Sequence, residues 1–145
     1  MTVRASKGLR NGVLAVDSLA ALLAAAELII YGGTGVPNHP EDAINTGTNP
    51  ILFQASSIAW DTAGVANGIL SKTGTVSATA VAGTPLFYRI CETGDDGTAA
   101  DPGDESTIRF QGDVGIDLIL NNASFPGGTE TIDHINIYIP EALFA

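Results

Sequence analysis

The chain has 145 residues and a formal net charge of −10, with hydrophobic residues at 45% and charged residues at only 15%. That length is typical of a single domain whose core needs no disulfide or metal, and the net charge excludes a nucleic-acid partner, because contacts to phosphates require a basic surface. Cys91 is the only cysteine, so no intramolecular disulfide forms, and the apolar run around it predicts a buried structural thiol.

The cations are concentrated at the N-terminus, where Arg4, Lys7 and Arg10 are three of the six lysine and arginine residues. A basic segment on an acidic body favours docking on an acidic surface, and three cations that only solvate a terminus explain the pattern equally well. We predict a basic arm over residues 1–8 and one domain over residues 9–145. The apolar run that follows the arm is too short to cross a bilayer, so we expect no membrane partner.

A helical pattern opens the domain. Apolar residues recur there at spacings of four, three, four and three: Leu9, Val13, Val16, Ala20 and Leu23. That periodicity forms one face of an α-helix, and the alanines between positions 20 and 26 are strong helix formers. The sequence therefore predicts one helix over about residues 8–25 that packs against a sheet.

The remainder of the chain predicts strands separated by turns rich in glycine, proline and asparagine. The strand segments are 28–31, 51–58, 69–82, 86–91, 107–114, its continuation near 118–120, and 131–139. Residues 32–50 are predicted to form a loop. Because strand follows strand without intervening helices, the fold class is mainly β (α+β), with an N-terminal helix packed on an antiparallel β-sandwich or barrel of about seven strands.

Alternation within these segments predicts which side chains form the core. In 107–114, Ile108, Phe110 and Val114 point one way, and Thr107, Arg109, Gln111 and Asp113 point the other. In 131–139, Ile135, Ile137 and Ile139 point inward, opposite His134, Asn136 and Tyr138. We expect one core of Ile108, Phe110, Leu118, Ile135 and Ile137, with Leu23 or Val16 against it.

Residues that could carry catalysis or hold a cofactor are sparse. The glycine-rich turn 31–35 lacks the lysine and the following helix that nucleotide-binding loops need. His39 and His134 stand alone, without a metal-ligand spacing, and there is no Gly-x-Ser-x-Gly motif. We therefore expect a protein that is not an enzyme, with no catalytic residue and no cofactor.

An acidic loop stands out between Glu92 and Glu105, because it holds six carboxylates. Calcium prefers such ligands, but the order of an EF-hand is absent. A solvated hairpin tip without a metal is the favoured interpretation.

Several short segments of the chain, taken in their order, resemble the sequences of a family of small structural proteins of tailed bacteriophages and prophages. The segments are Leu9–Arg10–Asn11, LIIYGGTGVP (28–37), LFYRI (86–90), FQGDVG (110–115) with DLILNNASFPGG (117–128), and IDHINIYIP (132–140). The resemblance spans about residues 8–140, and the loops 36–50 and 92–105 are longer than the family pattern. It implies a virion component, such as a head decoration (cement) protein, and brings no catalytic residues with it.

On that resemblance, the expected function is a non-enzymatic capsid decoration protein on the virion head, assembled in the host cytoplasm. It would bind and stabilise the lattice of the major capsid protein through many repeated contacts, as a homo-oligomer; a trimer fits a site where three capsid subunits meet. One alternative is a tail- or baseplate-associated structural protein. Another is a carbohydrate- or calcium-binding surface module, in which Trp60 and Tyr138 would be the exposed aromatic residues.

Four residues are candidates for the interface. Arg4, Lys7 and Arg10 would contact the capsid or a neighbouring copy, because most of the chain is acidic. Phe125 is the one large residue of the segment 121–128 that we expect to be exposed.

Overall fold

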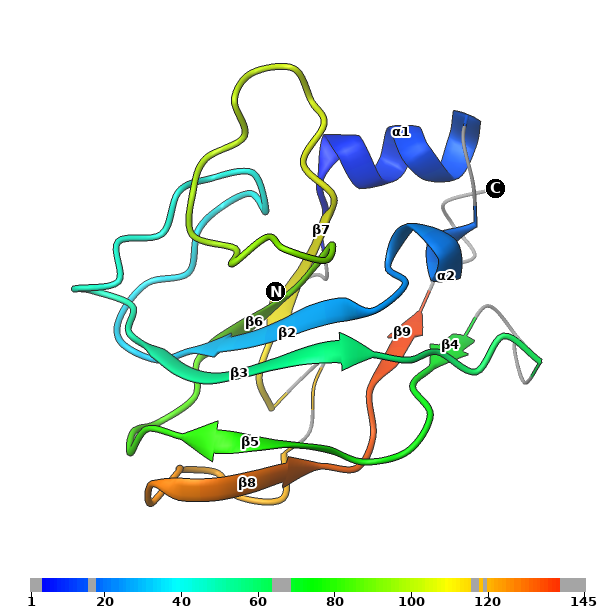
Figure 1. Cartoon of the computed structure of the whole chain (residues 1–145). Helices are drawn as coiled ribbons and strands as arrows, with labels where there is room; N and C mark the ends of the chain where they lie inside the picture. Colours follow the sequence, from blue (N-terminus) through cyan, green and yellow to red (C-terminus); the bar gives the residue numbers. More distant parts are fainter. Residues whose placement is uncertain (1–3, 16–17, 64–68, 116–117, 119, 139–145) are drawn as a thin grey trace.

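A computed structural model describes residues 4–15, 18–63, 69–115, 118 and 120–138 (Figure 1). It confirms a mainly β, α+β fold in which the strands pair antiparallel. The strands are β1 (Arg4–Ala5), β2 (Ala26–Tyr31), β3 (Ile51–Ile58), β4 (Ile69–Ser71), β5 (Val76–Ala80), β6 (Phe87–Cys91), β7 (Arg109–Asp113), β8 (Gly128–Ile132) and β9 (Asn136–Tyr138). The helices are α1 (Lys7–Ala15) and α2 (Leu19–Leu22).

Five strands form the main sheet, in the order β1-β7-β6-β2-β3. The middle strand, β6, is buried along its whole length, in keeping with the apolar run around Cys91. The other strands form two ribbons, β4–β9 and β5–β8, and the latter lies beside β3, where the Val81 N–H donates to the Leu52 carbonyl at 2.8 Å (Figure 1). The described strands do not close into a barrel, so the arrangement is looser than the predicted sandwich or barrel.

Strand register separates the side chains of the main sheet into two faces. Leu28 pairs with Ile90, which pairs with Phe110, whereas Arg89 lies between Ile29 and Gln111. The first row packs in the large apolar cluster together with residues from both ribbons. Most of the predicted core is confirmed there: Leu23, Phe110, Leu118, Ile135 and Ile137 are all buried, and Ile108 packs against them half-buried. Val16 lies outside the described residues.

The prediction of one helix over residues 8–25 is wrong, because two shorter helices replace it. Ser18 has an extended backbone (φ −71°, ψ 157°), and its Oγ accepts a hydrogen bond from the Ala21 N–H, so it begins a new helix as its N-cap. α2 ends before Leu23, and Ala26 already belongs to β2. Leu23 and Ala26 are fully buried, so tertiary packing overrides the helix propensity of the alanines. Val13, predicted on the buried side, is 37% exposed.

Two long predicted strands are each divided in the structure. The segment 69–82 turns at Gly74, whose φ of 62° suits glycine, and becomes β4 and β5. The segment 131–139 covers the end of β8, which begins at Gly128, and all of β9. β8 pairs with β5 and β9 pairs with β4, so the two segments bend together at 72–75 and 133–135. β1 was not predicted and no strand is described at 118–120, so the described residues form nine strands instead of about seven. Ser77 and Thr79 are exposed; the side chains of Tyr138 and Ile139 lie outside the description.

Candidate functional site

The most polar buried region lies on the face of the main sheet opposite the large apolar cluster. Two long loops, 32–50 and 92–108, cover it (Figure 1), and we call it the loop-covered face. Arg109 and Gln111 point away from the core as predicted. They lie under the loops and not in solvent, however, since their exposed fractions are 2% and 0%.

Arg89 binds the two loops to the sheet. Its Nε donates to Oε1 of Gln111 at 2.8 Å, which fixes the guanidinium over β7. Its Nη1 donates to the carbonyls of Asp42 at 2.9 Å and Gly97 at 2.7 Å, and its Nη2 donates to the carbonyl of His39 at 3.2 Å. One side chain in the central strand therefore holds a point in each loop.

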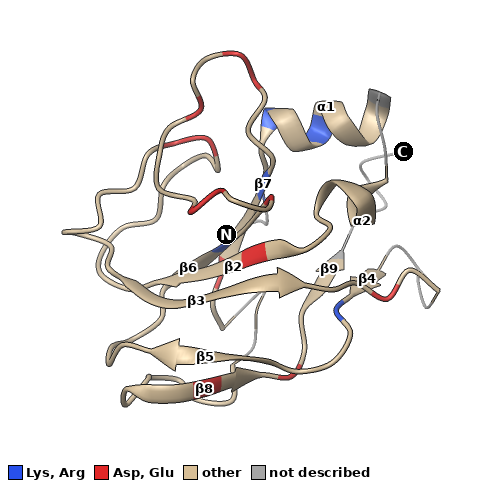
Figure 2. Cartoon of the chain, in the orientation of Figure 1, with Lys and Arg blue, Asp and Glu red and all other residues tan. Residues whose placement is uncertain are grey.

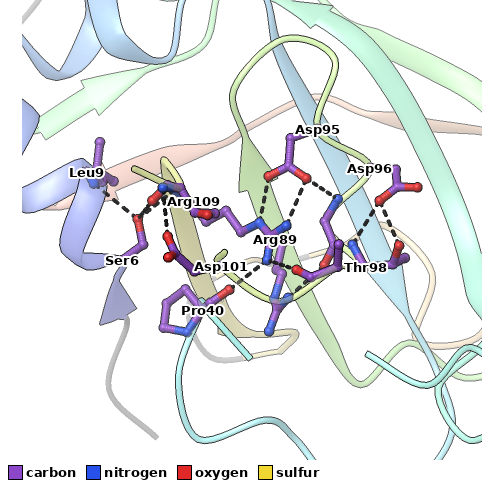
Figure 3. A network of polar contacts seen from close by, with 12 residues as sticks. Ser6, Leu9, Pro40, Arg89, Asp95, Asp96, Thr98, Asp101 and Arg109 are labelled. Carbon is purple, nitrogen blue, oxygen red and sulfur yellow. Dashed lines mark hydrogen bonds and ion pairs between the residues drawn. The ribbon is translucent and has the colours of Figure 1, made fainter. Parts of the chain in front are cut away.

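Arg109, in the neighbouring strand, makes the second connection (Figure 3). It forms a bidentate ion pair with Asp95, with Nε–Oδ2 at 2.6 Å and Nη2–Oδ1 at 2.9 Å. Its Nη1 also donates to the carbonyls of Pro40 at 3.1 Å and Ala99 at 2.8 Å. We call Arg89 and Arg109 the buried arginine pair. The sequence contained a signal for it: an arginine inside the apolar run LFYRIC needs partners from elsewhere in the chain.

Burial shifts the titration of several groups on this face. Desolvation, and next the charge of Arg109, lowers the pKa of Arg89 to about 10, so it stays cationic at neutral pH. Burial by itself would lower the pKa of Arg109, but the hydrogen bonds and charge of Asp95 outweigh it and the pKa is raised. Burial also raises the pKa of Cys91 and of Tyr31. Cys91 is fully buried, which confirms the prediction of a buried thiol.

Gly97 shows how closely the acidic loop approaches the sheet. Its φ is 74°, and a Cβ there would lie 2.7 Å from the Tyr31 hydroxyl and 3.1 Å from the Cys91 sulfur. The Tyr31 hydroxyl donates to the carbonyl of the preceding residue, Asp96, at 3.2 Å. A side chain at position 97 would therefore lift the loop off the sheet.

The acidic loop is only partly the solvated tip that the sequence predicts. Asp95 turns inward to Arg109, and Asp101 accepts backbone N–H groups of Gly103 at 2.7 Å and Thr107 at 2.9 Å. Hydrogen bonds from Thr107, above all, hold the pKa of Asp101 well below its usual range. Asp104 is exposed, like the tip itself. In the part of the chain that the structure describes, no three His, Cys, Asp or Glu side chains form a group that could hold a metal ion.

The other loop is organised around Asn49, which is 7% exposed. Its Nδ2 donates to the carbonyls of Gly32 and Gly35 at 3.0 Å and of Thr34 at 3.3 Å. Beside it lies an open depression lined by small and polar residues, with Asp42 its one carboxylate. That carboxylate accepts the His39 N–H at 2.9 Å, so the depression contains no arrangement of nucleophile and base.

The predicted basic arm is wrong for residues 4–8, which are built into the domain. Arg4 is half-buried in β1 and pairs with Gln111, and Lys7 begins α1. The ammonium of Lys7 lies 3.1 Å from a carboxylate oxygen of Glu105. Arg10 is exposed on α1. Residues 1–3 lie outside the described chain.

The prediction that Phe125 is exposed is also wrong, because it is 3% exposed. Its backbone exchanges hydrogen bonds with Gly83 at 2.8 and 3.0 Å, and its ring lies 6.3 Å from that of Phe53 in the large apolar cluster. This pairing spans more than 40 residues, so the local sequence could not reveal it. Phe125 is therefore withdrawn as an interface residue.

The remaining candidates take ordinary positions. His39 and His134 are exposed, and the Trp60 Nε1–H donates to the Leu23 carbonyl at 2.8 Å. The large apolar side chains exposed within the described residues are all aliphatic: Val13, Leu14 and Val81. That pattern gives no support to the carbohydrate-binding alternative. Within the described ranges, no helix is long and apolar enough to span a membrane.

Comparisons with known proteins found no relative. No protein-family model, no curated protein and no solved structure matches the chain.

Proposed function

We propose that this chain is a non-enzymatic structural protein of a tailed-phage particle, and specifically a capsid decoration (cement) protein on the virion head. The observation that carries the proposal is that the buried polar side chains bond to the protein itself. Arg89 and Arg109 donate their N–H groups to loop carbonyls, to Gln111 and to Asp95. Groups so engaged hold the fold and have little capacity left for a substrate.

The order of the sequence segments that resemble the phage family supports the same proposal. The segments 28–37, 86–90 and 110–115 contain most of β2, β6 and β7, the three inner strands of the main sheet. The last segment, 132–140, contains β9. Three of the segments that resemble the phage family therefore lie in the inner strands of the main sheet, and the loops 36–50 and 92–105 lie outside these strands.

Rigid loops suit a protein that works by repeated contact. A decoration protein binds a symmetric lattice, so that modest contacts add up through avidity, and each contact is stronger when its surface needs no ordering on binding. The buried arginine pair supplies such order for both loops. The partner we propose is the major capsid protein, and the form we propose is a closed homo-oligomer, with a trimer fitting a threefold lattice site.

Copy number tests the proposal. Particles of the phage or prophage that encodes the chain would be purified, and the ratio of this chain to the major capsid protein measured by quantitative mass spectrometry. Hundreds of copies per particle are expected for a head decoration protein. A few to tens of copies would favour the tail or baseplate instead, and absence from the particle would refute the structural role. A density map of the intact particle would then locate the chain.

Reconstitution tests the stabilising role. Particles from a deletion strain would be incubated with purified protein and heated, with genome release followed by dye fluorescence. The proposal expects saturable binding and a higher release temperature. Saturable binding with an unchanged release temperature would retain attachment and reject the cement role.

A further inference from the structure

The surface cations of this protein are concentrated on one helix. All six lysine and arginine residues lie in the described part of the chain. Three of them are buried, at 0% to 8% exposure: Lys72, Arg89 and Arg109. Arg4 is half-buried in β1. The two that remain, Lys7 and Arg10, are exposed and both lie on α1 (Figure 2).

The side of α1 that packs on the domain is made of small residues and one leucine. Leu9 is 1% exposed, and a Cβ at Gly8 would lie 2.5 Å from the Thr107 carbonyl oxygen. Gly12 is buried against Leu22 of α2. The close approach fixes how the helix is rotated, and so decides which residues point outward.

The opposite side of α1 combines charge with exposed apolar surface. Lys7, Arg10, Asn11 and Leu14 are all exposed and fall at spacings of three and four residues, which places them on one side. We call these four residues the α1 outer face. Leu14 is 82% exposed, the highest value among the large apolar residues that are described, and Val13 beside it is 37% exposed. A leucine so exposed gains free energy when a partner covers it.

The two cations differ in how free they are to bind. Lys7 is already next to Glu105, at 3.1 Å, in a pair whose side chains are both about half exposed. The Arg10 guanidinium has no partner among the described residues; only its backbone N–H is engaged, with the Ser6 carbonyl at 3.0 Å. A free guanidinium can take a carboxylate in a bidentate pair.

We infer that the α1 outer face is the surface by which this chain docks on an acidic protein partner, with Leu14 in an apolar depression and Arg10 on a carboxylate. The inference rests on the proposed function, under which the partner is the exterior of the capsid lattice. Charge argues for this face: among the described residues the other four cations are buried or half-buried, so Lys7 and Arg10 are the exposed cations on a chain of net charge −10. Any other approach to an acidic surface would be indifferent or repelled, so this face orients the encounter.

Matched variants test the inference on undecorated particles. Leu14→Ser removes the apolar contact, and Val81→Ser is its control, because Val81 is 59% exposed at the end of β5, away from α1 (Figure 1). Arg10→Gln lowers the net charge by one unit, and Thr73→Glu makes the same change at an exposed position between β4 and β5. The full-length variants would be bound to the particles at low and moderate salt, and occupancy measured against protein concentration.

We expect Leu14→Ser and Arg10→Gln each to weaken apparent affinity by about tenfold or more, and each control by less than about twofold. Wild-type binding should weaken with salt more than Arg10→Gln binding does, because the variant has lost a charge contact. All four positions are exposed, so thermal unfolding should be unchanged and confirm that the variants fold.

Three outcomes would overturn the inference in distinguishable ways. If the wild type and the α1 variants bind the particles with equal occupancy, the decoration role is retained and the α1 outer face is rejected as the docking surface. Light scattering could instead show that Leu14→Ser dissociates an oligomer. If the dissociated chain keeps its affinity for the particle, the α1 outer face makes contacts between copies of the chain. Failure of the wild type to bind any particle of its phage would reject the proposed function itself.

Discussion

On one face of the main sheet, Leu28, Ile90 and Phe110 pack with apolar residues of the two ribbons; on the other, Arg89 and Arg109 hold two loops by hydrogen bonds to their carbonyls. Both faces are buried, yet the physical reasons differ. Apolar burial is non-directional and scales with area. The loop-covered face has a smaller apolar cluster, in which Tyr31 stacks on Phe87, and it adds directional bonds, because a buried cation is costly unless its donors are paired.

The contrast teaches what each face contributes. The apolar face supplies most of the stability and should tolerate substitutions that conserve volume. The loop-covered face fixes the position of 32–50 and 92–108, and it should tolerate little, because removal of one donor leaves several acceptors buried and unpaired. Five predictions test this difference, from the largest expected effect to the smallest.

Phe110→Ala should lower the free energy of unfolding by about 3–5 kcal/mol, since it leaves a cavity in the large apolar cluster. Urea denaturation measures the loss, and limited proteolysis should detect no preferential cleavage within the loops. Cleavage confined to the loops would mean that the two faces are not separate. Val81→Ala, at an exposed site, is the control and should change the free energy by under about 0.5 kcal/mol.

Arg89→Met should cost about 3–4 kcal/mol, because it leaves four acceptors without their donor at roughly 1 kcal/mol each. Here proteolysis should cleave within 36–50 and 92–105 before the sheet unfolds. Arg10→Met removes an exposed cation from α1 and should leave both measurements unchanged. Loss of stability without loop cleavage would contradict the loop-holding role of Arg89.

Asp95→Asn should cost about 1.5–3 kcal/mol, because Arg109, 2% exposed, loses the charge of its bidentate partner but keeps a side chain of the same shape. Thermal and urea unfolding would be compared with those of Asp104→Asn, an exposed carboxylate in the same loop. Equal effects of the two substitutions would show that the ion pair adds nothing beyond loop charge.

Acid should reduce the stability that the Asp101 carboxylate gives to the acidic loop. Its pKa in the folded chain is below the ordinary value of about 3.9, so its stabilisation is complete above about pH 4 and is lost as the pH falls towards the folded pKa. Asp101→Asn should therefore narrow the difference in melting temperature between pH 7 and pH 3. An equal difference in wild type and variant would falsify this role of the carboxylate.

Calcium should have the smallest effect, with no measurable change in melting temperature at millimolar concentration. Asp95 is engaged with Arg109, and Asp96 accepts the Thr98 N–H at 3.0 Å and the Thr98 hydroxyl at 2.7 Å. A rise of several degrees that disappears in the double variant Asp95→Asn, Asp96→Asn would instead identify a calcium site and revive the surface-module alternative.

Four of the five strands of the main sheet could be predicted because their signal is local, whereas β1, at Arg4–Ala5, is too short to show a pattern. Residues 51–58 match β3, and the core of β2 and all of β6 lie within their predicted segments. The alternation in 107–114 also assigned Phe110 and Gln111 to opposite faces, as the register confirms. Alternation marks a strand that is buried on one face, and a continuous apolar run marks a strand such as β6 that is buried on both faces. Both patterns can be recognised from neighbouring residues.

The loop-covered face could be predicted only in part, because alternation states which way a side chain points and not what covers it. Arg89 and His39 are 50 residues apart, and no local pattern joins them. The bend shared by the two ribbons and the burial of Phe125 against Gly83 are pairings of the same long-range kind. Local propensity is weak beside such contacts, which is also why the alanine-rich helix ends before Leu23.

The α1 outer face divides in the same way. By itself, the sequence determined that Arg10 and Leu14 lie four residues apart in a helical segment, off the apolar stripe, so they could share a side. Only the tertiary structure decided that this side is exposed, because Gly8 packs against Thr107 from a segment almost a hundred residues away and sets the rotation of the helix. It also decided that three other cations are buried, which leaves Lys7 and Arg10 as the exposed positive charges among the described residues. Spacing along a chain fixes neighbours on one element, whereas exposure depends on every element that packs against it.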